Sequence, residues 1–370
     1  QFLLAQLGCN ADPALGRLLR AVDSARSRIT TTVSEQGDLP DHPSESEGEF
    51  VRRRRDSLEA RLHADRTALQ KSEQELREAA TGRCAEVVLA KIRSRLRDYE
   101  YDDDQVLFEL AQNADDAIRQ RHGHREEGRE QVMRALEIET IDDTTLIVRH
   151  RGRCINDCNS DRERQMGYDN DLLHMLRMNF SDKAEQEGAT GKFGLGFKSV
   201  HLIAEEVRVC SGHLAFDIVA GVWPRETRSE LPPGSGQTEL RLTLRRDQSG
   251  AELVQHFVQR AELYPVFSTA TTELRVSVDG RPRRCAWAPT LRRSFDGSAR
   301  LELGRLHVSG ADRTLLVMGE WDRDTKHRLT IAFSIGAKGP APLPNGVPSV
   351  WVTAPLEAQR EWNLGYCIGG

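Results

Sequence analysis

Three polar side chains in the segment FELAQNADDAIRQ have the types and the spacing that a magnesium nucleotide site needs. Glu109, Asn113 and Asp116 lie at i, i+4 and i+7, so on a helix they share one face. An amide oxygen is a ligand that Mg²⁺ accepts, which assigns Asn113 to the metal. A carboxylate can take a proton from water, which assigns that role to Glu109. The sequence therefore predicts a helix that presents an acid, an amide and a second acid to a phosphate-bearing ligand.

A glycine-rich stretch, GATGKFGLGFKSVHLI from Gly188 to Ile203, offers the complementary chemistry. Gly191, Gly194 and Gly196 mark a turn, and an apolar, helix-compatible run follows at once. Backbone amides at such a turn and helix start can face an anion. We expect this stretch to bind phosphates, while a turn that serves only packing is the alternative that the composition leaves open.

Together the two segments resemble known motifs. Glu-x-x-x-Asn-x-x-Asp-Ala followed by Gly-x-Phe-Gly-x-Gly-Phe-x-Ser is similar to the N box and second glycine box of the GHKL ATPases, which include gyrase B, the 90-kDa heat-shock chaperones, histidine kinases and MutL. The segments QNADDA and GKFGLGFKSV most resemble those of sacsin and its bacterial relatives. The resemblance implies an α+β fold, namely a Bergerat-type α/β sandwich in which helices cover a mixed sheet. It also implies ATP and Mg²⁺ as cofactors.

The first glycine box of that family, Asp-x-Gly-x-Gly, is altered in this chain. His150 stands where the family has the aspartate that reads the adenine amino group, and Cys154 replaces the second glycine, while Gly152 is kept. A neutral His150 could accept a hydrogen bond through one ring nitrogen. An ordinary residue at a strand end is the alternative. Whether the site reads adenine or guanine therefore stays open.

Further site residues follow from the resemblance. Residues 155–189 correspond to the lid that folds over bound nucleotide, so Lys183 and Lys192 become candidate phosphate contacts, with plain surface lysines as the alternative. Thr238 is expected near the base, with an ordinary strand threonine as the alternative. Beside Glu109 as the catalytic base, the expected ATP-binding set is Asn113, Asp116, His150, Gly152, Lys183, Gly191, Lys192, Phe193, Gly194, Leu195, Gly196, Phe197 and Thr238.

The elements that must position these residues fall into three predicted regions. Residues 1–83 are expected to form a helical extension with a flexible linker near 31–49, which is rich in Ser, Glu, Pro and Gly. Residues 84–246 are the predicted GHKL ATPase domain. Residues 247–370 are predicted to be a second, transducer-like middle domain that continues beyond the C-terminus, because the chain reads as a piece of a longer protein.

Within these regions the sequence predicts particular elements. A charged helix is expected from residue 50 to 80, with leucines at 62, 69 and 76 that suit either a short coiled coil or packing on its own domain. ALEIETIDDTTLIVRH predicts a hairpin that turns at Asp142 and Asp143, and TELRVSVDGRPRRCAW predicts another that turns at Asp279 and Gly280. AELVQHFVQRAELYPVF is predicted to be one helix.

Composition limits the classes of function. The chain has 370 residues, with 52 basic and 57 acidic side chains and a formal net charge of -5. This balance argues against electrostatic capture of nucleic acid by the whole chain. Seven scattered cysteines predict reduced thiols rather than a disulfide framework. No apolar run approaches the length of a membrane span, so we expect a cytoplasmic protein without a membrane partner.

The predicted function is Mg-ATP binding and slow hydrolysis that drives lid closure in a chaperone-like or clamp machine. The resemblance suggests a larger multidomain protein of bacterial defence or quality control and an ATP-dependent homodimer, while no motif identifies a protein client. One alternative is a non-hydrolysing nucleotide-binding scaffold, motivated by His150 and Cys154. Another is a DNA-linked ATPase of the gyrase B or MutL type. A histidine kinase is disfavoured because Glu109 stands four residues before Asn113 and a phosphoacceptor helix is missing.

Overall fold

A computed structural model describes residues 4, 7–40, 48–122, 134–176, 195–232, 234–295, 299–321, 328–343, 347–351 and 365–369. The chain divides into two compact units, Gln1–Arg95 and Leu96–Gly370. Strands on both sides of residue 247 belong to one sheet of the second unit. The domain boundary expected there stays a prediction.

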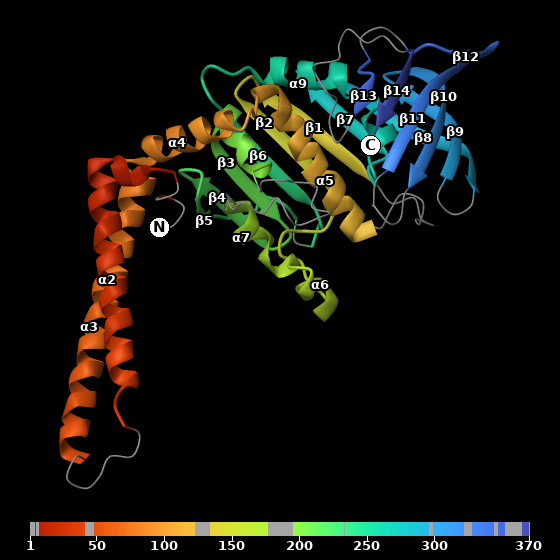
Figure 1. Ribbon diagram of the computed structural model, residues 1–370. Coiled ribbons are helices and arrows are strands. Elements are labelled where there is room, and N and C mark those ends of the chain that lie inside the picture. Colours follow the sequence, from red (N-terminus) through yellow and green to blue (C-terminus); the bar gives the residue numbers. More distant parts are fainter. Residues whose placement is uncertain are drawn as a thin grey trace. The chain divides into compact units, whose positions relative to one another are not determined.

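The first unit is helical (Figure 1). Its elements are η1 (Cys9–Ala11), α2 (Pro13–Gly37), α3 (Gly48–Thr81) and the start of α4 (Ala85–Asp98). The α2 helix begins after Asp12 because the carboxylate of that residue accepts hydrogen bonds from the backbone N–H groups of Ala14 and Leu15. Pro13 fits the first turn, where its missing N–H has no helical partner to lose.

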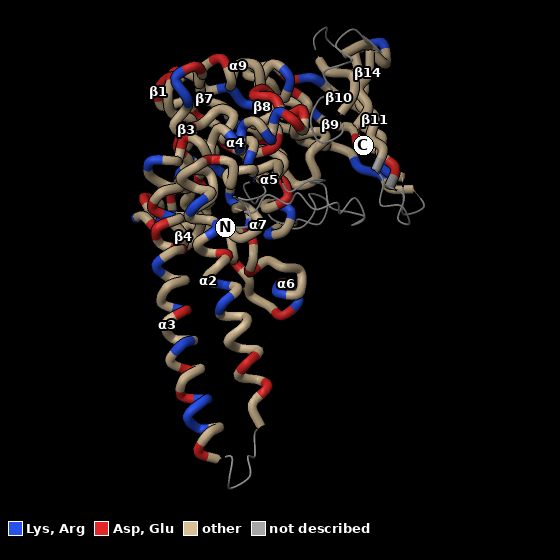
Figure 2. Tube along the Cα trace, turned by 60° about the vertical axis from the view of Figure 1, so that its left-hand side comes forward, with Lys and Arg blue, Asp and Glu red and all other residues tan. Residues whose placement is uncertain are grey.

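The α2 and α3 helices form an antiparallel hairpin with a heptad-spaced seam. Val51, Leu58 and Asp65 are buried at intervals of seven, and Asp65 accepts a hydrogen bond from Arg28 of α2 at 2.8 Å. The trace in Figure 2, coloured by residue type, shows positions of both basic and acidic residues along the two helices. Two predicted leucines, Leu62 and Leu69, are only half-buried beside this seam. The heptad pattern of α3 therefore serves packing within the chain.

Part of the predicted linker is helical. The α2 helix continues to Gly37, which corrects the expectation that the linker begins near residue 31. The hydroxyl groups of Thr30 and Thr31 donate to carbonyls one turn back, and Thr32 is buried. Packing on α3 here outweighs the weak helix propensity of threonine. Residues 41–47 of the predicted linker lie outside the described residues.

The second unit is built on one mixed sheet. Among the described residues the strand order is β13-β14-β11-β10-β9-β8-β7-β1-β2-β6-β3-β4-β5, with β12 beside β11. The pairs β1–β7 and β13–β14 are parallel, and the other pairs are antiparallel. The strands are β1 (Ala135–Asp142), β2 (Thr145–His150), β3 (Ala204–Ser211), β4 (Leu214–Val219), β5 (Trp223–Glu226), β6 (Thr238–Leu244), β7 (Glu273–Val278), β8 (Arg281–Phe295), β9 (Ala299–Val308), β10 (Ala311–Trp321), β11 (Arg328–Gly336), β12 (Gly339–Ala341), β13 (Val350–Trp351) and β14 (Tyr366–Gly369).

The described helices that follow α4 are η2 (Asp103–Gln105), α5 (Val106–His122), α6 (Asp161–Gln165), η3 (Tyr168–Asn170), α7 (Asp171–Leu176), η4 (Phe197–Ser199), α8 (Val200–Ile203), α9 (Gly250–Arg260) and α10 (Tyr264–Phe267). Among them, α5, α8, α9 and α10 pack against strands of the sheet. Figure 1 shows α5 lying across the sheet, where it contacts β1, β2 and α9. The rings of Phe108 in α5 and Phe257 in α9 have centroids 4.7 Å apart. This mixed sheet with covering helices and a helical N-terminal region confirms the predicted α+β class.

Turn residues explain where the hairpins reverse. The structure has the predicted hairpin of β7 and β8, and Asp279 and Gly280 take φ values of 50° and 72°, as a two-residue hairpin turn requires. The predicted hairpin of β1 and β2 is also present. The single helix predicted from residue 251 to 267 is wrong, because it is divided into α9 and α10 around Ala261 to Leu263. Pro265 lacks the N–H that a continuous helix would bond to the carbonyl of Ala261, and it lies in the first turn of α10, where this bond is not needed.

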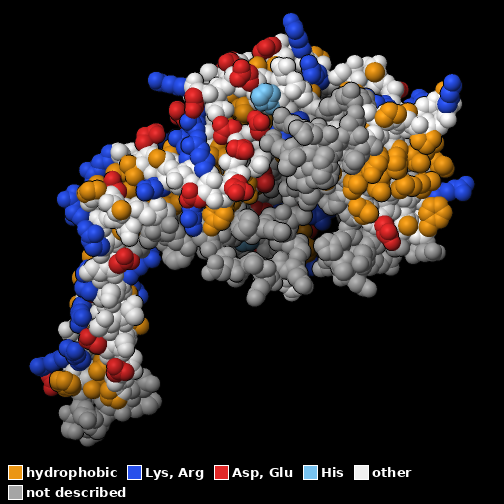
Figure 3. Space-filling view, turned by 45° about the horizontal axis from the view of Figure 1, so that its top comes forward, with side chains coloured by type: hydrophobic (Ala, Val, Ile, Leu, Met, Phe, Trp, Pro, Cys, Tyr) orange, Lys and Arg blue, Asp and Glu red, His pale blue; other side chains and the backbone are white. Residues whose placement is uncertain are grey.

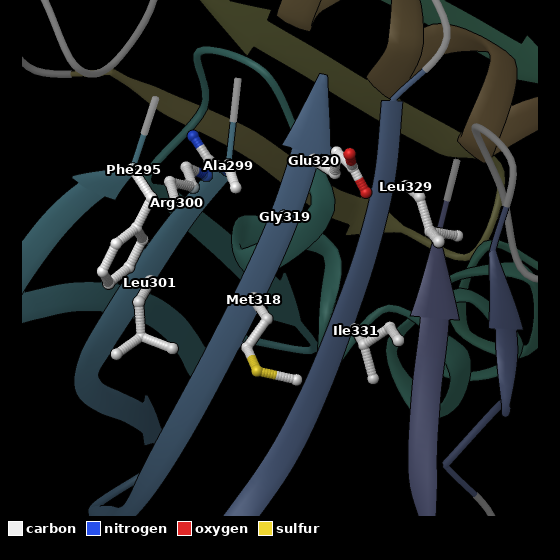
Figure 4. Close-up of a pocket in the computed structure, with 9 residues that line it drawn as sticks. All are labelled: Phe295, Ala299, Arg300, Leu301, Met318, Gly319, Glu320, Leu329 and Ile331. Atoms are coloured by element: carbon white, nitrogen blue, oxygen red, sulfur yellow. The ribbon is translucent and has the colours of Figure 1, made fainter. Parts of the chain in front are cut away.

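An apolar groove crosses the C-terminal strands. Figure 3 shows hydrophobic side chains gathered over this part of the sheet. In Figure 4 the side chains of Leu301, Met318 and Ile331 lie in a row across β9, β10 and β11. Phe295 and Leu329 at the rim are each 50% exposed. No site residue predicted from the sequence lies in this groove.

The remaining expectations concern cysteines and membranes. All seven cysteines are free, as predicted. Six of them are buried, and Cys158 is half-buried. Within the described part of the chain, no helix combines the length and the apolar character that a membrane crossing requires.

Candidate functional site

The α5 helix separates a buried apolar face from a polar stripe. Leu107 and Leu110 are buried, whereas Glu109 and Asp116 are half-buried and Asn113 is exposed. The stripe arises because these three polar residues recur at helical spacing on a face of the helix that differs from the buried apolar face. The eight residue-to-residue steps from 109 to 117 span about 12 Å along the helix axis. The stripe is therefore long enough to connect two separate contact points.

Gly196 marks the first contact point. A side-chain Cβ at this position would overlap Oε2 of Glu109, so the carboxylate lies directly against the glycine backbone. Leu195 beside it is buried and Phe197 is half-buried. The described part of the glycine-rich stretch thus meets α5 at the predicted acid. Lys183, Gly191, Lys192, Phe193 and Gly194 lie outside the described residues, so their predicted phosphate contacts stay predictions.

Glu109 has the environment of a proton acceptor. Burial raises the pKa of its carboxyl group above the ordinary value. Nothing in the described ranges donates a hydrogen bond to it or forms an ion pair with it. Tyr101 is a neighbour that the sequence analysis missed, and its pKa is raised to about 12 by burial and by the charge of Glu109. A desolvated carboxylate of this kind is suited to take a proton from water.

Asn113 suits the metal role assigned to it. The side chain is exposed on the same stripe as Glu109, and no described residue bonds to its amide. Mg²⁺ usually keeps several waters and binds one or two protein oxygens together with substrate phosphates. The described residues contain no cluster of three or more acidic, histidine or cysteine ligands that could hold a metal without substrate. One exposed amide oxygen therefore fits a magnesium ion that would be bound together with a nucleotide.

The adjacent residues Asp115 and Asp116 have different surroundings. Asp116 on the stripe pairs with Arg119 at 2.6 Å, and burial raises the pKa of its carboxyl group against the opposing effect of that arginine. Asp115 is buried and accepts five hydrogen bonds from the backbone and hydroxyl groups of the segment 269–271. No role was predicted for Asp115 from the sequence. Its position seven residues after Phe108, on the buried face, is the signal that could have revealed it.

Gly152 marks the second contact point on α5. A Cβ at this position would overlap backbone atoms of Ala117 and Ile118. The N–H of Arg153 donates to the carbonyl of Ala117 at 2.8 Å, and Arg121 donates to the carbonyl of Gly152 at 3.2 Å. Glycine is needed at 152 because the loop after β2 passes directly over the helix backbone. The loop and the C-terminal part of α5 are thus fixed to each other.

His150 and Thr238 lie opposite each other on β2 and β6. Nδ1 of His150 accepts a hydrogen bond from the backbone N–H of Gly152 at 3.1 Å. Withdrawal from water lowers the pKa of the His150 ring to about 4, so the ring is neutral at physiological pH. The hydroxyl of buried Thr238 bonds to the hydroxyl of Ser211 at 2.6 Å. Ser211, which the sequence analysis missed, also accepts from the N–H of Ile155 at 2.9 Å.

Arg153 holds the described part of the predicted lid. Its guanidinium donates to both carboxylate oxygens of Asp171 at 2.7 and 2.8 Å and lies 3.9 Å from the ring centroid of Tyr168. A bidentate pair of this kind fixes geometry as well as charge. No role was predicted for Arg153 from the sequence. Residues 168–171 are therefore attached to the loop that carries Gly152.

Lys198 lies just after Gly196 and is fully buried. Its Nζ donates to the carbonyl of Gly221 at 2.6 Å, and burial lowers the pKa of the ammonium group to about 7. Ser199 donates to the carbonyl of Gly196 at 2.6 Å, which closes the turn. The helix expected after the glycines is short, because α8 ends at Ile203 and β3 begins at Ala204.

Comparison with solved structures found ATPase domains. One is the 43K ATPase domain of Thermus thermophilus gyrase B, at 14% identity and a TM-score of 0.34, covering 55% of this chain and 57% of that one. Another is the Saccharomyces cerevisiae topoisomerase II ATPase region, at 10% identity and a TM-score of 0.31, covering 55% and 58%. A third is the Francisella tularensis topoisomerase IV ATP-binding domain, at 9% identity and a TM-score of 0.38, covering 70% and 65%. The chain spans less than two thirds of each of these structures, and the likeness is too distant to support an argument about activity.

Comparison with families gives a more local result. The curated proteins included no match to this chain. Residues 85–219, which carry the stripe of α5, the His150 loop and Gly196, match the family described as the Sacsin domain. This match confirms the sacsin-like resemblance that the wording of the two motifs predicted for this segment.

Proposed function

We propose that this chain binds a magnesium nucleoside triphosphate along the polar stripe of α5 and hydrolyses its terminal phosphate. The observation that carries the proposal is the contact between the Glu109 carboxylate and Gly196, in a setting that raises the pKa of the acid. The motif resemblance makes ATP the expected nucleotide. The terminal phosphate would lie at the Gly196 end of the stripe and the base at the Gly152 end.

Each residue of the stripe has a separate role in this mechanism. Glu109 orients a water molecule and takes its proton as the water attacks the terminal phosphorus. Asn113 holds the magnesium ion, which supplies charge neutralisation to the phosphates when bound. The backbone amides between Gly191 and Gly196 donate to the phosphate oxygens. Half-burial of Glu109 assists the proton transfer, because the carboxylate has exchanged part of its hydration for a neutral backbone.

The output proposed for hydrolysis is conformational. Residues 155–189 act as the lid, and Arg153 links its described part to the base end of the site. The strands after residue 247 share a sheet with β1 and β2. A change of conformation that depends on the bound nucleotide could therefore be transmitted through this sheet to the C-terminal strands. A chaperone-like or clamp machine that dimerises with ATP, as part of a larger defence or quality-control protein, is the biological setting proposed from the resemblance.

Phosphate release measured with Mg²⁺ and ATP, ITP or GTP tests the proposal. Glu109→Ala and Glu109→Gln are expected to lower the rate by about 100-fold or more, as the loss of a general base does. Glu205→Gln is the matched control, because Glu205 is an exposed acid on β3, and it should keep the wild-type rate. Wild-type turnover no faster than that of Glu109→Ala would refute hydrolysis. If nucleotide still bound, the result would favour the scaffold alternative.

A further inference from the structure

The ring nitrogens of His150 have unequal roles. A backbone N–H can only donate, so the 3.1 Å bond from Gly152 requires a lone pair on Nδ1. A neutral imidazole carries one proton, which must then sit on Nε2. The low pKa of about 4 keeps the ring in this neutral form at physiological pH. His150 therefore presents an N–H donor at Nε2, where an aspartate would present an acceptor.

The contacts of the neighbouring loop fix this assignment. Gly152 cannot move toward α5, because its backbone already touches Ala117 and Ile118. It is held there by the bond from the N–H of Arg153 to Ala117 and by the guanidinium of Arg121 on its carbonyl. The N–H of Gly152 is thus directed at Nδ1 by the fold. Rotation of the imidazole ring would break this bond and leave a partly buried N–H without an acceptor.

Nε2 is the polar atom of His150 left for a ligand. Among the described residues, the N–H of Gly152 is the one group that forms a hydrogen bond with this ring. Thr238, directly opposite on β6, has its hydroxyl engaged with Ser211, and Ser211 is engaged with Ile155. The strand-end polar groups around His150 are therefore satisfied by one another. A base that reaches this end of the stripe meets one free donor.

We propose that His150 selects a purine that carries an oxygen at position 6, as in guanine or hypoxanthine, over adenine. This inference rests on the proposed function, because it names the base of the same nucleotide. A 6-oxo group accepts the Nε2 hydrogen, whereas the 6-amino group of adenine places donor against donor. A desolvated donor that is left without an acceptor weakens binding by roughly 5- to 150-fold, which sets the size of the expected preference.

Calorimetric titration of the whole chain with Mg²⁺ and either ITP or ATP tests this assignment. The pair is matched because the two bases differ in the group at position 6 and the proton on N1, and neither carries the 2-amino group of guanine. Wild type should bind ITP at least about fivefold more tightly than ATP. GTP should follow ITP. Tighter binding of ATP than of ITP would overturn the inference, and Glu109-dependent ATP hydrolysis in the same sample would leave the proposed function standing.

Two variants at position 150, with side chains of equal size, test whether the preference depends on a donor or an acceptor at this position. Asn and Asp both offer an oxygen that can accept from the N–H two residues on, which preserves the Gly152 bond. His150→Asn then presents a donor and should keep the ITP preference, whereas His150→Asp presents an acceptor and should reverse it toward ATP. An unchanged preference in a folded His150→Asp protein would overturn the role of His150. Failure of wild type to bind any of the three nucleotides would refute both the inference and the proposed function.

Discussion

The two ends of the polar stripe on α5 are held in place differently. At the base end, backbone and side-chain groups satisfy one another, since Asp115 accepts five hydrogen bonds and Gly152 packs on the helix backbone. At the phosphate end, two ionisable groups are removed from water with little compensation. Glu109 meets a glycine, and the described acceptor of Lys198 is one carbonyl. The first end therefore has the contacts of a structural anchor, and the second end is where the proposed chemistry would take place.

This difference has a physical reason. A buried carboxylate that is fully hydrogen-bonded fixes structure but is a poor proton acceptor, because its donors stabilise the charge. A carboxylate that has lost water without gaining donors is destabilising for the fold and more basic. Asp115 accepts five hydrogen bonds, whereas no described residue donates to Glu109, whose pKa is raised by burial. Variants at the two ends should therefore change different measured quantities.

The largest effect on stability is expected for Asp115→Ala. The change leaves five donors of residues 269–271 without their acceptor, and we expect a loss of about 3 kcal/mol or more in the free energy of unfolding. Urea titration measures it. The adjacent Asp116→Ala is the control and should cost less than about 1 kcal/mol, because its partner Arg119 is partly exposed. Equal losses for the two variants would contradict the assignment of Asp115 as the anchor.

The two glycines that touch α5 provide the next comparison. Gly152→Ala forces a methyl group into helix backbone and should cost about 1–3 kcal/mol. Gly196→Ala meets the far end of the Glu109 side chain, which can turn aside, so stability should fall by less than about 1 kcal/mol while phosphate release drops. Thermal unfolding and turnover of both variants check the prediction. A Gly196→Ala protein with wild-type turnover would show that the carboxylate position is not required.

Lys198 should make stability depend on pH. Its folded pKa of about 7 lies below the unfolded value near 10.4, so between these values the unfolded chain binds more protons and stability rises with pH. From pH 7 to 8.5 the gain should be about 1–2 kcal/mol. Lys198→Met should remove this gain and be the more stable protein at pH 6. Parallel pH dependences for wild type and variant in urea titrations would contradict the burial of an uncompensated ammonium.

Sequence patterns predicted the elements better than their interactions. Period-two strands, the Asp279-Gly280 turn and the apolar face of α5 depend on local spacing, and the structure contains all three. The roles of Asp115 and Asp116 could not be separated by residue type. They differ because one faces a segment more than 150 positions later in the chain. Long-range partners of this kind leave no local trace in the sequence.

The candidate site shows the same limit. The sequence placed Glu109 and Asn113 on one helical face, and the structure brings Glu109 to Gly196. The replacement of aspartate by His150 was visible, but the tautomer depends on where the N–H of Gly152 points. Thr32 shows the same limit in the helical hairpin. The polar composition around it is typical of a linker, but the residue is buried and lies within α2.

The smallest effect expected is that of Glu109→Gln on stability, and its sign is diagnostic. Burial raises the folded pKa of Glu109 above the unfolded value, so the folded state holds the proton more tightly. Stability from this group is therefore present at low pH and lost as pH rises through the folded pKa. Glutamine keeps the shape without the charge. The variant should unfold at a higher temperature than wild type at pH 7.5, and the difference should shrink toward pH 5.

Glu205→Gln supplies the reference for this measurement, because it makes the same change of side chain at an exposed position on β3. If Glu109→Gln were instead less stable than wild type at pH 7.5, the carboxylate would have to accept hydrogen bonds in the folded state. It would then resemble Asp115, and the contrast between an anchored end and a reactive end of α5 would be lost. A Glu109→Gln variant that is more stable than wild type but inactive would show that the desolvated carboxylate lowers the stability of the fold and is needed for hydrolysis.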